Sequence, residues 1–283
     1  MVQHAPGPSK QPATRGLNPH ATVGIEPVTM ADTKVGDFVW YELMTTDATA
    51  AIAFYEHVLG WISSPFGNDY TMFANQEGPL AGVSVLPDAS KQTGARPHWS
   101  SHVQVVNVDQ TVAQATKLGG RLYFGPADIP EVGRFAAIGD PDGAPISVFT
   151  PSRPMPERDR KRHGAFVWHE MIATEHERAF AFHSKLFGWK RSAEHDMGPM
   201  GKYLIYGNGG PDLGGMFTKP KAVPAAMWMY YIQVDKLGPA FERAQAKGAK
   251  VLQGPMEVPG GAHIVQLSDP QGATFSLHED PPK

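Results

Sequence analysis

The chain contains the same segment twice. Residues 36–61 and 164–189 align without a gap at a constant offset of 128, and eleven positions are identical. The identical pairs are Gly36/Gly164, Phe38/Phe166, Val39/Val167, Trp40/Trp168, Glu42/Glu170, Thr46/Thr174, Ala51/Ala179, Ala53/Ala181, Phe54/Phe182, Gly60/Gly188 and Trp61/Trp189. An internal repeat of this length indicates two similar units in tandem. Each functional residue then has a counterpart, and the differences between counterparts are informative.

Composition limits the classes of function. The 283 residues suffice for about two domains. A net charge of −3, from 25 basic and 28 acidic residues, is too balanced for an electrostatic nucleic-acid binder. No stretch approaches the ~18 apolar residues of a membrane span. The absence of cysteine removes disulfides and thiolate metal sites and fits a reducing cytoplasm. We therefore expect a cytoplasmic protein that binds a small molecule and neither nucleic acid nor membrane.

The pattern of composition divides the chain into four parts. Residues 1–33 are rich in proline, glycine and polar groups, which predicts a flexible tail. The repeat predicts one domain over 36–150 and a second over 164–280, and the polar, proline-containing stretch 151–163 separates them as a linker.

Each copy opens with the pattern of a strand followed by a helix. Residues 38–44 are aromatic and apolar, as is typical of a strand. Asp47 is placed to cap a helix, and Gly60 is placed to end it. Glu175 and Gly188 take these positions in the second copy.

Each half continues with more strands and then repeats the pattern. Counterparts in this later part are offset by 129, and both halves end in a predicted hairpin, turning at 140–143 and at 269–272. Each half therefore reads as two βαβββ modules, and the chain as an α+β protein of four modules.

The helix endings and hairpin turns resemble those of one known family. Residues 54–61 and 182–189, with the turns at 140–143 and 269–272, resemble the vicinal oxygen chelate superfamily, which includes glyoxalases, bleomycin-resistance proteins and extradiol dioxygenases. The opening of each copy is also similar to tandem glyoxalase-like proteins of actinobacteria. The resemblance implies two glyoxalase-like domains with curled mixed sheets, each forming a cup around a small molecule.

The resemblance also implies where a metal would be bound. In this superfamily His or Glu on the first and last strands of modules usually holds a divalent ion. Those positions are Trp40 and Trp168 on first strands, His102 in the second module, and Ser147 and Ser276 on last strands. Tryptophan cannot bind a metal and serine is a poor ligand for one, so Ser147 and Ser276, like Tyr231, are expected to contact the small molecule itself. We therefore expect no complete metal site of the family type and no cofactor.

Strand alternation groups the candidate residues of each cup. Trp40, Glu42 and Met44 share one face, and Trp168 and Glu170 share the equivalent face. A carboxylate beside tryptophan in an apolar cup has a raised pKa, which suits acid–base chemistry. The tryptophans would stack on a flat aromatic ligand, and the methionine would supply packing or an adaptable pocket wall. A purely structural role for both carboxylates is the alternative.

His102 and Tyr231 occupy equivalent positions in the two halves, at the offset of 129. Either could serve as the polar partner of the carboxylate in its own cup, His102 with Glu42 and Tyr231 with Glu170. This difference predicts that the cups have different roles.

The last hairpins suggest a second possible metal site. A turn at 269–272 places His263 opposite His278, and Glu170 would be the third ligand of a two-histidine, one-carboxylate site. The alternative is two unrelated histidines. The corresponding residues of the first half are Arg134 and Phe149, so Arg134 is a candidate anchor for an anion or carbonyl group in the first cup.

Two further histidines are assigned to structural positions. His169, the counterpart of Tyr41, alternates to the outer face of its strand, where it is expected to pack against a helix or to be exposed. His183 occupies a core-facing helical position that Tyr55 takes in the first copy, so a hydrogen-bonded core histidine is expected.

Three functions remain open from the sequence. The chain could sequester a small, aromatic or carbonyl-bearing metabolite, as antibiotic-resistance proteins of the family do. It could be a metal-free enzyme of secondary metabolism or detoxification that uses Glu42 or Glu170 as general base. The third alternative is a metal-dependent lyase, isomerase or dioxygenase. Since four modules can pair within one chain, a monomer and a homodimer are both compatible with the sequence.

Overall fold

The structure is a computed structural model that describes residues 35–92 and 94–282. The predicted tail, 1–33, lies outside the described residues. None of the helices in the described part is long and apolar enough to cross a membrane.

The first half forms one eight-stranded mixed sheet with strand order β2-β3-β4-β1-β5-β8-β7-β6. Its elements are β1 (Phe38–Thr45), α1 (Ala48–Leu59), β2 (Ile62–Pro65), β3 (Thr71–Asn75), β4 (Gly78–Val85), α2 (Asp88–Gln92), β5 (His98–Gln104), α3 (Val108–Lys117), β6 (Arg121–Ile129), β7 (Gly133–Gly139) and β8 (Pro145–Pro151). The short helix α2 joins two βαβββ modules, whose first strands β1 and β5 pair antiparallel at the centre of the sheet.

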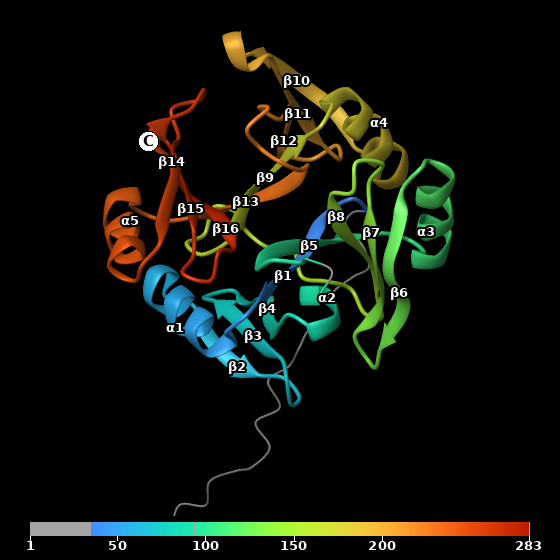
Figure 1. Ribbon diagram of the computed structural model, residues 1–283, viewed down its shortest axis with the longest axis horizontal. Helices are drawn as coiled ribbons and strands as arrows, with labels where there is room; N and C mark the ends of the chain where they lie inside the picture. The colour runs from blue at the N-terminus through green and yellow to red at the C-terminus, as the bar shows by residue number, and fades with distance from the viewer. Residues whose placement is uncertain (1–34, 93, 283) are drawn as a thin grey trace, which may run out of the picture.

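The second half repeats this arrangement in the order β10-β11-β12-β9-β13-β16-β15-β14. Its elements are β9 (Phe166–Ala173), α4 (His176–Phe187), β10 (Lys190–Asp196), the 3-10 helix η1 (Gly198–Met200), β11 (Lys202–Gly207), β12 (Asp212–Thr218), β13 (Met227–Gln233), α5 (Leu237–Ala246), β14 (Lys250–Glu257), β15 (His263–Ser268) and β16 (Thr274–Glu279). The predicted α+β class, with four βαβββ modules in two curled mixed sheets, is confirmed (Figure 1).

The first helix of each half begins and ends as the sequence predicts. Asp47 accepts a hydrogen bond from the backbone N–H of Ala50, and Gly60 ends α1 in the left-handed conformation with φ of 66°. Glu175 and Gly188, with φ of 71°, do the same for α4.

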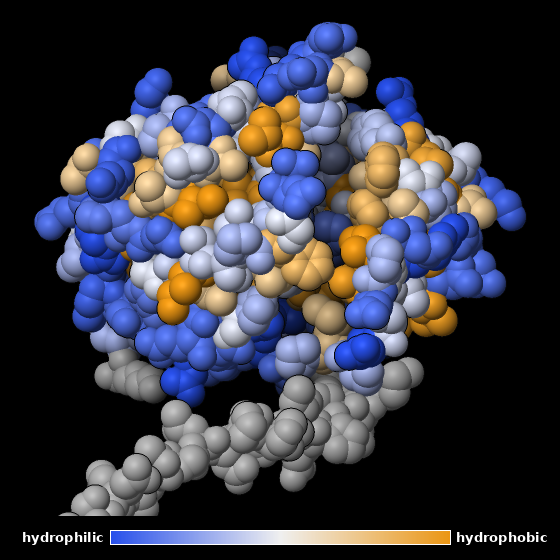
Figure 2. Space-filling model, turned by 90° about the horizontal axis from the view of Figure 1, so that it is seen from below, coloured by the Kyte–Doolittle hydropathy of each residue, from blue (hydrophilic) through white to orange (hydrophobic). Residues whose placement is uncertain are grey.

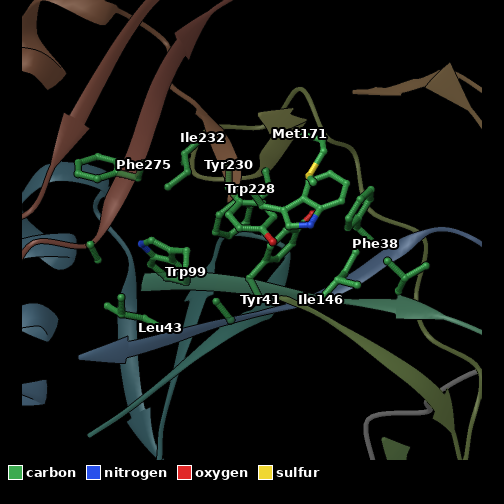
Figure 3. Close-up of a cluster of buried hydrophobic side chains, with 14 of the residues drawn as sticks. Phe38, Tyr41, Leu43, Trp99, Ile146, Met171, Trp228, Tyr230, Ile232 and Phe275 are labelled. Atoms are coloured by element: carbon green, nitrogen blue, oxygen red, sulfur yellow. The ribbon is translucent and has the colours of Figure 1, made fainter. Parts of the chain in front are cut away.

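The two halves share one hydrophobic core. Helix α1 contacts α5, α3 contacts α4, and β5 contacts β13, so the two long helices of each half lie beside those of the other. Figure 3 shows side chains from both halves meeting there, among them Tyr41, Trp99, Trp228 and Tyr230. Because the outward-facing residues of β1 and β9 lie in this contact, the alternating residues of the same strands face away from it, into the two cups.

Two tryptophans, one from each half, donate hydrogen bonds to the backbone of the other half. Trp61 Nε1 donates a hydrogen bond to the carbonyl oxygen of Gly164 at 3.0 Å, and Trp189 Nε1 donates to that of Gly36 at 2.8 Å. Both glycines have positive φ, and an added Cβ would lie 2.5 Å from the backbone oxygen of Phe187 at Gly36 and 2.5 Å from Trp61 Nε1 at Gly164. These two identical pairs of the repeat therefore serve the contact between halves.

Candidate functional site

The first cup contains a short hydrogen-bond relay. Trp40 Nε1 donates to Tyr70 Oη at 2.9 Å, and the Tyr70 hydroxyl donates to Glu42 Oε2 at 2.8 Å. Gly82 on β4 makes room for the ring, since a Cβ there would lie 1.8 Å from Tyr70 Oη. Burial raises the pKa of Glu42 to about 7, and the hydrogen bond from Tyr70 opposes that rise. Glu42 is therefore a carboxyl group that changes protonation near neutral pH.

The second cup repeats the relay with more donors. Trp168 Nε1 donates to Tyr203 Oη at 2.9 Å, and Tyr203 donates to Glu170 Oε1 at 2.9 Å. The other carboxylate oxygen accepts a hydrogen bond from Tyr231 at 3.0 Å, and Gln266 Nε2 lies 2.8 Å from the Tyr231 oxygen and 3.5 Å from Glu170 Oε2. Burial raises the pKa of Glu170. Both of its oxygens are already engaged by the protein.

His102 lies beside the first relay. It is opposite Trp40 in the β1–β5 pairing and next to Ser147 in the β5–β8 pairing. The rings of Phe135 and Phe149 lie 5.9 and 6.1 Å from its own. Burial lowers the pKa of His102 to about 4, so the imidazole is neutral near pH 7. Its Nδ1 is buried and has no hydrogen-bond partner among the described residues.

The two cups differ most in how they are filled. Four residues of the second cup, Ile172, Met229, Tyr231 and Ile264, are at most 7% exposed and form a hydrophobic cluster. Partly buried apolar residues pack against it. The counterparts in the first cup are all only half-buried: Met44, Ser100, His102 and Phe135. The second cup is thus packed with its own side chains.

The first cup is more accessible. A cavity of about 550 Å³ lies at the end of β4, between the start of α1 and α2, and Tyr70 and Ser84 are part of its lining whereas Glu42 and His102 are not. Figure 2 views the molecule from below Figure 1, where this half lies, and shows apolar side chains on both sides of a hollow. Phe124, whose ring lies 5.4 Å from that of Phe135, is 56% exposed. The first cup therefore offers an aromatic wall to a ligand.

The prediction that Arg134 faces the first cup is wrong. Arg134 pairs with Thr150 in the hairpin, one residue from the expected register, and so it lies on the opposite face. Its guanidinium group binds Asp109 at 2.8 Å, at the start of α3, and Asp128 at 2.9 Å.

The predicted pairing of His263 with His278 is also wrong. His263 lies opposite Glu279, while His278 lies opposite Ile264, so the two imidazoles are on different faces. His278 Nδ1 is 2.8 Å from Gln233 Oε1, and the side chain of His263 is 47% exposed. The metal site proposed for these histidines and Glu170 is therefore not assembled.

The residues at the family's metal-binding positions do not fit a divalent ion. Around His102 the neighbouring strands present Trp40 and Ser147, and the equivalent place in the second cup holds Trp168, Tyr231 and Ser276. In residues 35–92 and 94–282 no three His, Asp or Glu side chains are grouped so as to hold a metal ion. One imidazole alone is a poor donor set.

The sequence interpretation missed both tyrosines of the relays. Tyr70 lies just before β3 and Tyr203 lies on β11, at an offset of 133 rather than 128, because the second copy is longer between helix and hairpin. Gly82 and Gly215 are separated by the same 133 residues, and a Cβ on Gly215 would lie 2.2 Å from Tyr203. A tyrosine and a glycine that recur at one offset were the available signal.

The chain matches the model of one protein family over both halves. The model of the Glyoxalase/Bleomycin resistance protein/Dioxygenase superfamily matches residues 37–148 and 165–277. CFP32 of Mycobacterium bovis, which its name describes as a glyoxylase, is 28% identical over 249 residues, covering 86% of this chain and 95% of the relative. The anthracycline biosynthesis protein DauV of a Streptomyces species is 23% identical over 256 residues, covering 85% and 92%.

Solved structures share the fold. The Mn(II)-bound glyoxalase from Novosphingobium aromaticivorans matches with a TM-score of 0.64 and 16% identity, over 88% of this chain and 83% of that one. Homoprotocatechuate 2,3-dioxygenase from Brevibacterium fuscum, in complex with 3,4-dihydroxyphenylacetate, matches with a TM-score of 0.64 and 13% identity, over 91% and 84%.

Proposed function

Because the chain belongs to the Glyoxalase/Bleomycin resistance protein/Dioxygenase superfamily, we propose that its first cup binds a small aromatic metabolite that carries hydroxyl or carbonyl groups. Glu42 accepts a hydrogen bond or a proton from the ligand. The second cup is structural, and its Glu170 holds neighbouring tyrosines together. A resident metal ion is not part of this proposal.

The observation that carries the proposal is the contrast between the two carboxyl groups. Tyr70 donates a hydrogen bond to one oxygen of Glu42, whose pKa is about 7. Trp40 and Ser84 also favour the ionised form. Glu170 receives bonds on both oxygens from Tyr203 and Tyr231 in a packed cluster. Glu42 thus retains acceptor capacity for a ligand, since an ionised carboxylate can accept several hydrogen bonds.

The chemical class follows from the surroundings of Glu42. Trp40, His102, Phe135 and the exposed Phe124 present aromatic surface, which favours a flat ring system. The similarity to a protein of anthracycline biosynthesis supports a polycyclic aromatic substrate class. The same geometry serves sequestration or a proton transfer that starts at a ligand hydroxyl.

The test uses quinizarin, a dihydroxyanthraquinone, as probe. Fluorescence titration of the full chain should show saturable binding at one site. Trp40→Phe should weaken that binding by about tenfold, because the ring that stacks on the ligand becomes smaller and the hydrogen bond from Trp40 to Tyr70 is lost. Arg134→Gln, on the opposite face of the sheet, is the matched control and should bind normally. Equal binding by Trp40→Phe and the unaltered chain would contradict the proposal.

Analysis of quinizarin recovered after incubation distinguishes sequestration from catalysis. Sequestration returns quinizarin with unchanged mass after incubation and extraction, whereas catalysis yields a product in liquid chromatography and mass spectrometry. Native mass spectrometry of freshly purified protein would identify a metabolite that co-purifies.

A metal-dependent lyase, isomerase or dioxygenase is the second candidate function. It is favoured by the position of His102, whose buried Nδ1 has no partner among the described residues, and by the metal-bound glyoxalase with the same fold. Elemental analysis of protein purified without chelators decides between the two. Stoichiometric iron, manganese, nickel or zinc that is lost in His102→Ala would favour the metal enzyme.

A further inference from the structure

A second cavity, of about 370 Å³, lies between the two halves and is distinct from both cups. Its walls include Val39 and Tyr41, which alternate along β1 with the cup residues Trp40 and Glu42 and therefore face the other way. The segment 155–161, which connects the halves, covers one side of it. Cavities of this size at domain interfaces are common sites for small molecules.

Two arginines of the connecting segment line this inter-half cavity. Arg160 Nη2 lies 3.2 Å from Asp37 Oδ1, while its Nη1 is buried without a hydrogen-bond partner among the described residues. Among the described residues Arg158 donates to the carbonyl oxygens of Gly78 and Pro79.

The lining holds three acidic and three basic residues, and Arg158 is the basic one that forms no ion pair within the described part of the chain. Burial lowers the pKa of Arg158, and the charge of Glu77 opposes that shift. A half-buried cation that lacks a direct ion pair is costly, so an anion beside it is favoured. The other charged residues of the lining, Glu157, Asp159 and Lys161, are exposed and screened by water.

The floor of the cavity is apolar. Phe38, Tyr41, Leu80 and Phe166 line it and are at most 8% exposed in the folded chain. Figure 3 shows Phe38 and Tyr41 extending from β1 into the contact between the halves. A ligand with an apolar ring would cover this floor while its charged end reaches the arginines.

We propose that the inter-half cavity binds a small organic acid, with its carboxylate on Arg158 and Arg160 and its ring against Phe38 and Phe166. A planar carboxylate matches the donor pair of a guanidinium group and can accept two parallel hydrogen bonds from it. The site is independent of the ligand proposed for the first cup.

The probe for this site is benzoate, and benzamide is the uncharged control with the same ring. Ligand-observed NMR titration of the full chain at pH 7 should show saturable binding of benzoate. Benzamide should bind at least about tenfold more weakly, because it lacks the charge-assisted hydrogen bonds. Equal affinity of the two probes, or no saturable benzoate binding, would overturn the proposal without the need for any variant.

Variants locate the benzoate site. Arg158→Gln should weaken benzoate binding by about tenfold or more. Arg162→Gln, directly after this segment and outside the cavity lining, and Glu42→Gln, in the first cup, should leave it unchanged. Loss of benzoate binding in Glu42→Gln would place the probe in the cup and overturn the inference. Because Arg158 also holds backbone carbonyls, circular dichroism should confirm folding, and Arg158→Lys, which keeps the charge, should retain part of the affinity.

Discussion

Tyr41 Oη and His169 Nε2 lie 2.6 Å apart where the two halves meet, and they occupy the same position in the two copies of the repeat. His169 also stacks on Phe38 with ring centres 3.7 Å apart, and Tyr41 stacks on Phe166 at 3.6 Å. His169 is therefore on the outer face of its strand, as predicted, but it is fully buried against the other half rather than against a helix or in water.

Tyr41→Phe should destabilise the chain. His169 Nδ1 lies 2.6 Å from the carbonyl oxygen of Leu213, which requires the proton on that nitrogen, so Nε2 accepts the bond from Tyr41. Without the hydroxyl, a buried acceptor is left unpaired, at a cost of about 1–3 kcal/mol. Denaturant unfolding measures this. Tyr123→Phe also removes a hydroxyl, which donates to the Gly143 carbonyl at the surface, and since water can replace that bond the free energy of unfolding should change by less than about 0.5 kcal/mol. Equal stability of the two variants would show that the hydrogen bond between Tyr41 and His169 does not stabilise the contact between the halves.

His183→Tyr should stabilise the protein. In one helix contact Trp99 Nε1 donates to Tyr55 Oη at 2.8 Å, and Tyr55 donates to Asp269 at 3.1 Å. The equivalent positions hold His183, Trp228 and Asp140. There both imidazole nitrogens, the Trp228 Nε1 and Asp140 Oδ2 have no hydrogen-bond partner within residues 35–92 and 94–282. The expectation of a hydrogen-bonded core histidine was therefore wrong.

The hydroxyl introduced by His183→Tyr can bridge the indole and the carboxyl group. We expect a gain of about 1–3 kcal/mol in the free energy of unfolding, and Tyr55→His should lose a similar amount. A lower midpoint of denaturation for His183→Tyr would show that the pocket cannot take the larger ring.

The same variant should change the pH dependence of stability. Burial lowers the pKa of His183 from 6.5 to about 3. As pH falls from 6.5 to 3, the unfolded chain binds a proton that the folded chain excludes, and stability is lost. The unaltered protein should therefore lose up to about 1.4 kcal/mol per pH unit more than His183→Tyr over this range. Unfolding curves at a series of pH values test this, and parallel pH profiles would contradict it.

Gly82→Ala should raise the pKa of Glu42 above its value of about 7. The added Cβ would displace Tyr70, whose hydrogen bond stabilises the ionised carboxylate. Carboxyl-carbon NMR of glutamate-labelled protein follows the titration directly. Gly238→Ala, which has no atom within 4 Å of the added group, is the control and should leave the midpoint unchanged. An unmoved Glu42 midpoint in Gly82→Ala would mean that Tyr70 does not tune the carboxyl group.

The sequence predicted the modules and helix caps but missed the register of the last hairpins. The carboxylate of Asp269 accepts hydrogen bonds from the backbone N–H groups of Gln271, Gly272 and Ala273, so the loop includes Ala273 and the strands resume at Ser268 and Thr274. A loop one residue longer than expected turns every later side chain to the other face. This reversal separated His263 from His278, and the equivalent loop at Asp140 did the same to Arg134.

The cup residues on central strands were predictable, but their partners were not. Trp40, Glu42 and His102 follow from alternation along one strand and its neighbour. Tyr70 reaches Glu42 from the residue just before β3, a strand two places away, and this requires the strand order β3-β4-β1 to be known. The unequal packing of the cups depends on such non-local contacts as well.

The most direct test of the central claim compares quinizarin binding by Glu42→Gln and Glu170→Gln. If Glu42 accepts the ligand's hydroxyl, binding of the unaltered chain should tighten as pH rises through about 7, where Glu42 becomes ionised. Glu42→Gln should bind about tenfold more weakly at pH 8 and lose the pH dependence, while Glu170→Gln should keep both affinity and pH dependence. Equal affinities for the two variants, or a loss confined to Glu170→Gln, would contradict the assignment of the first cup.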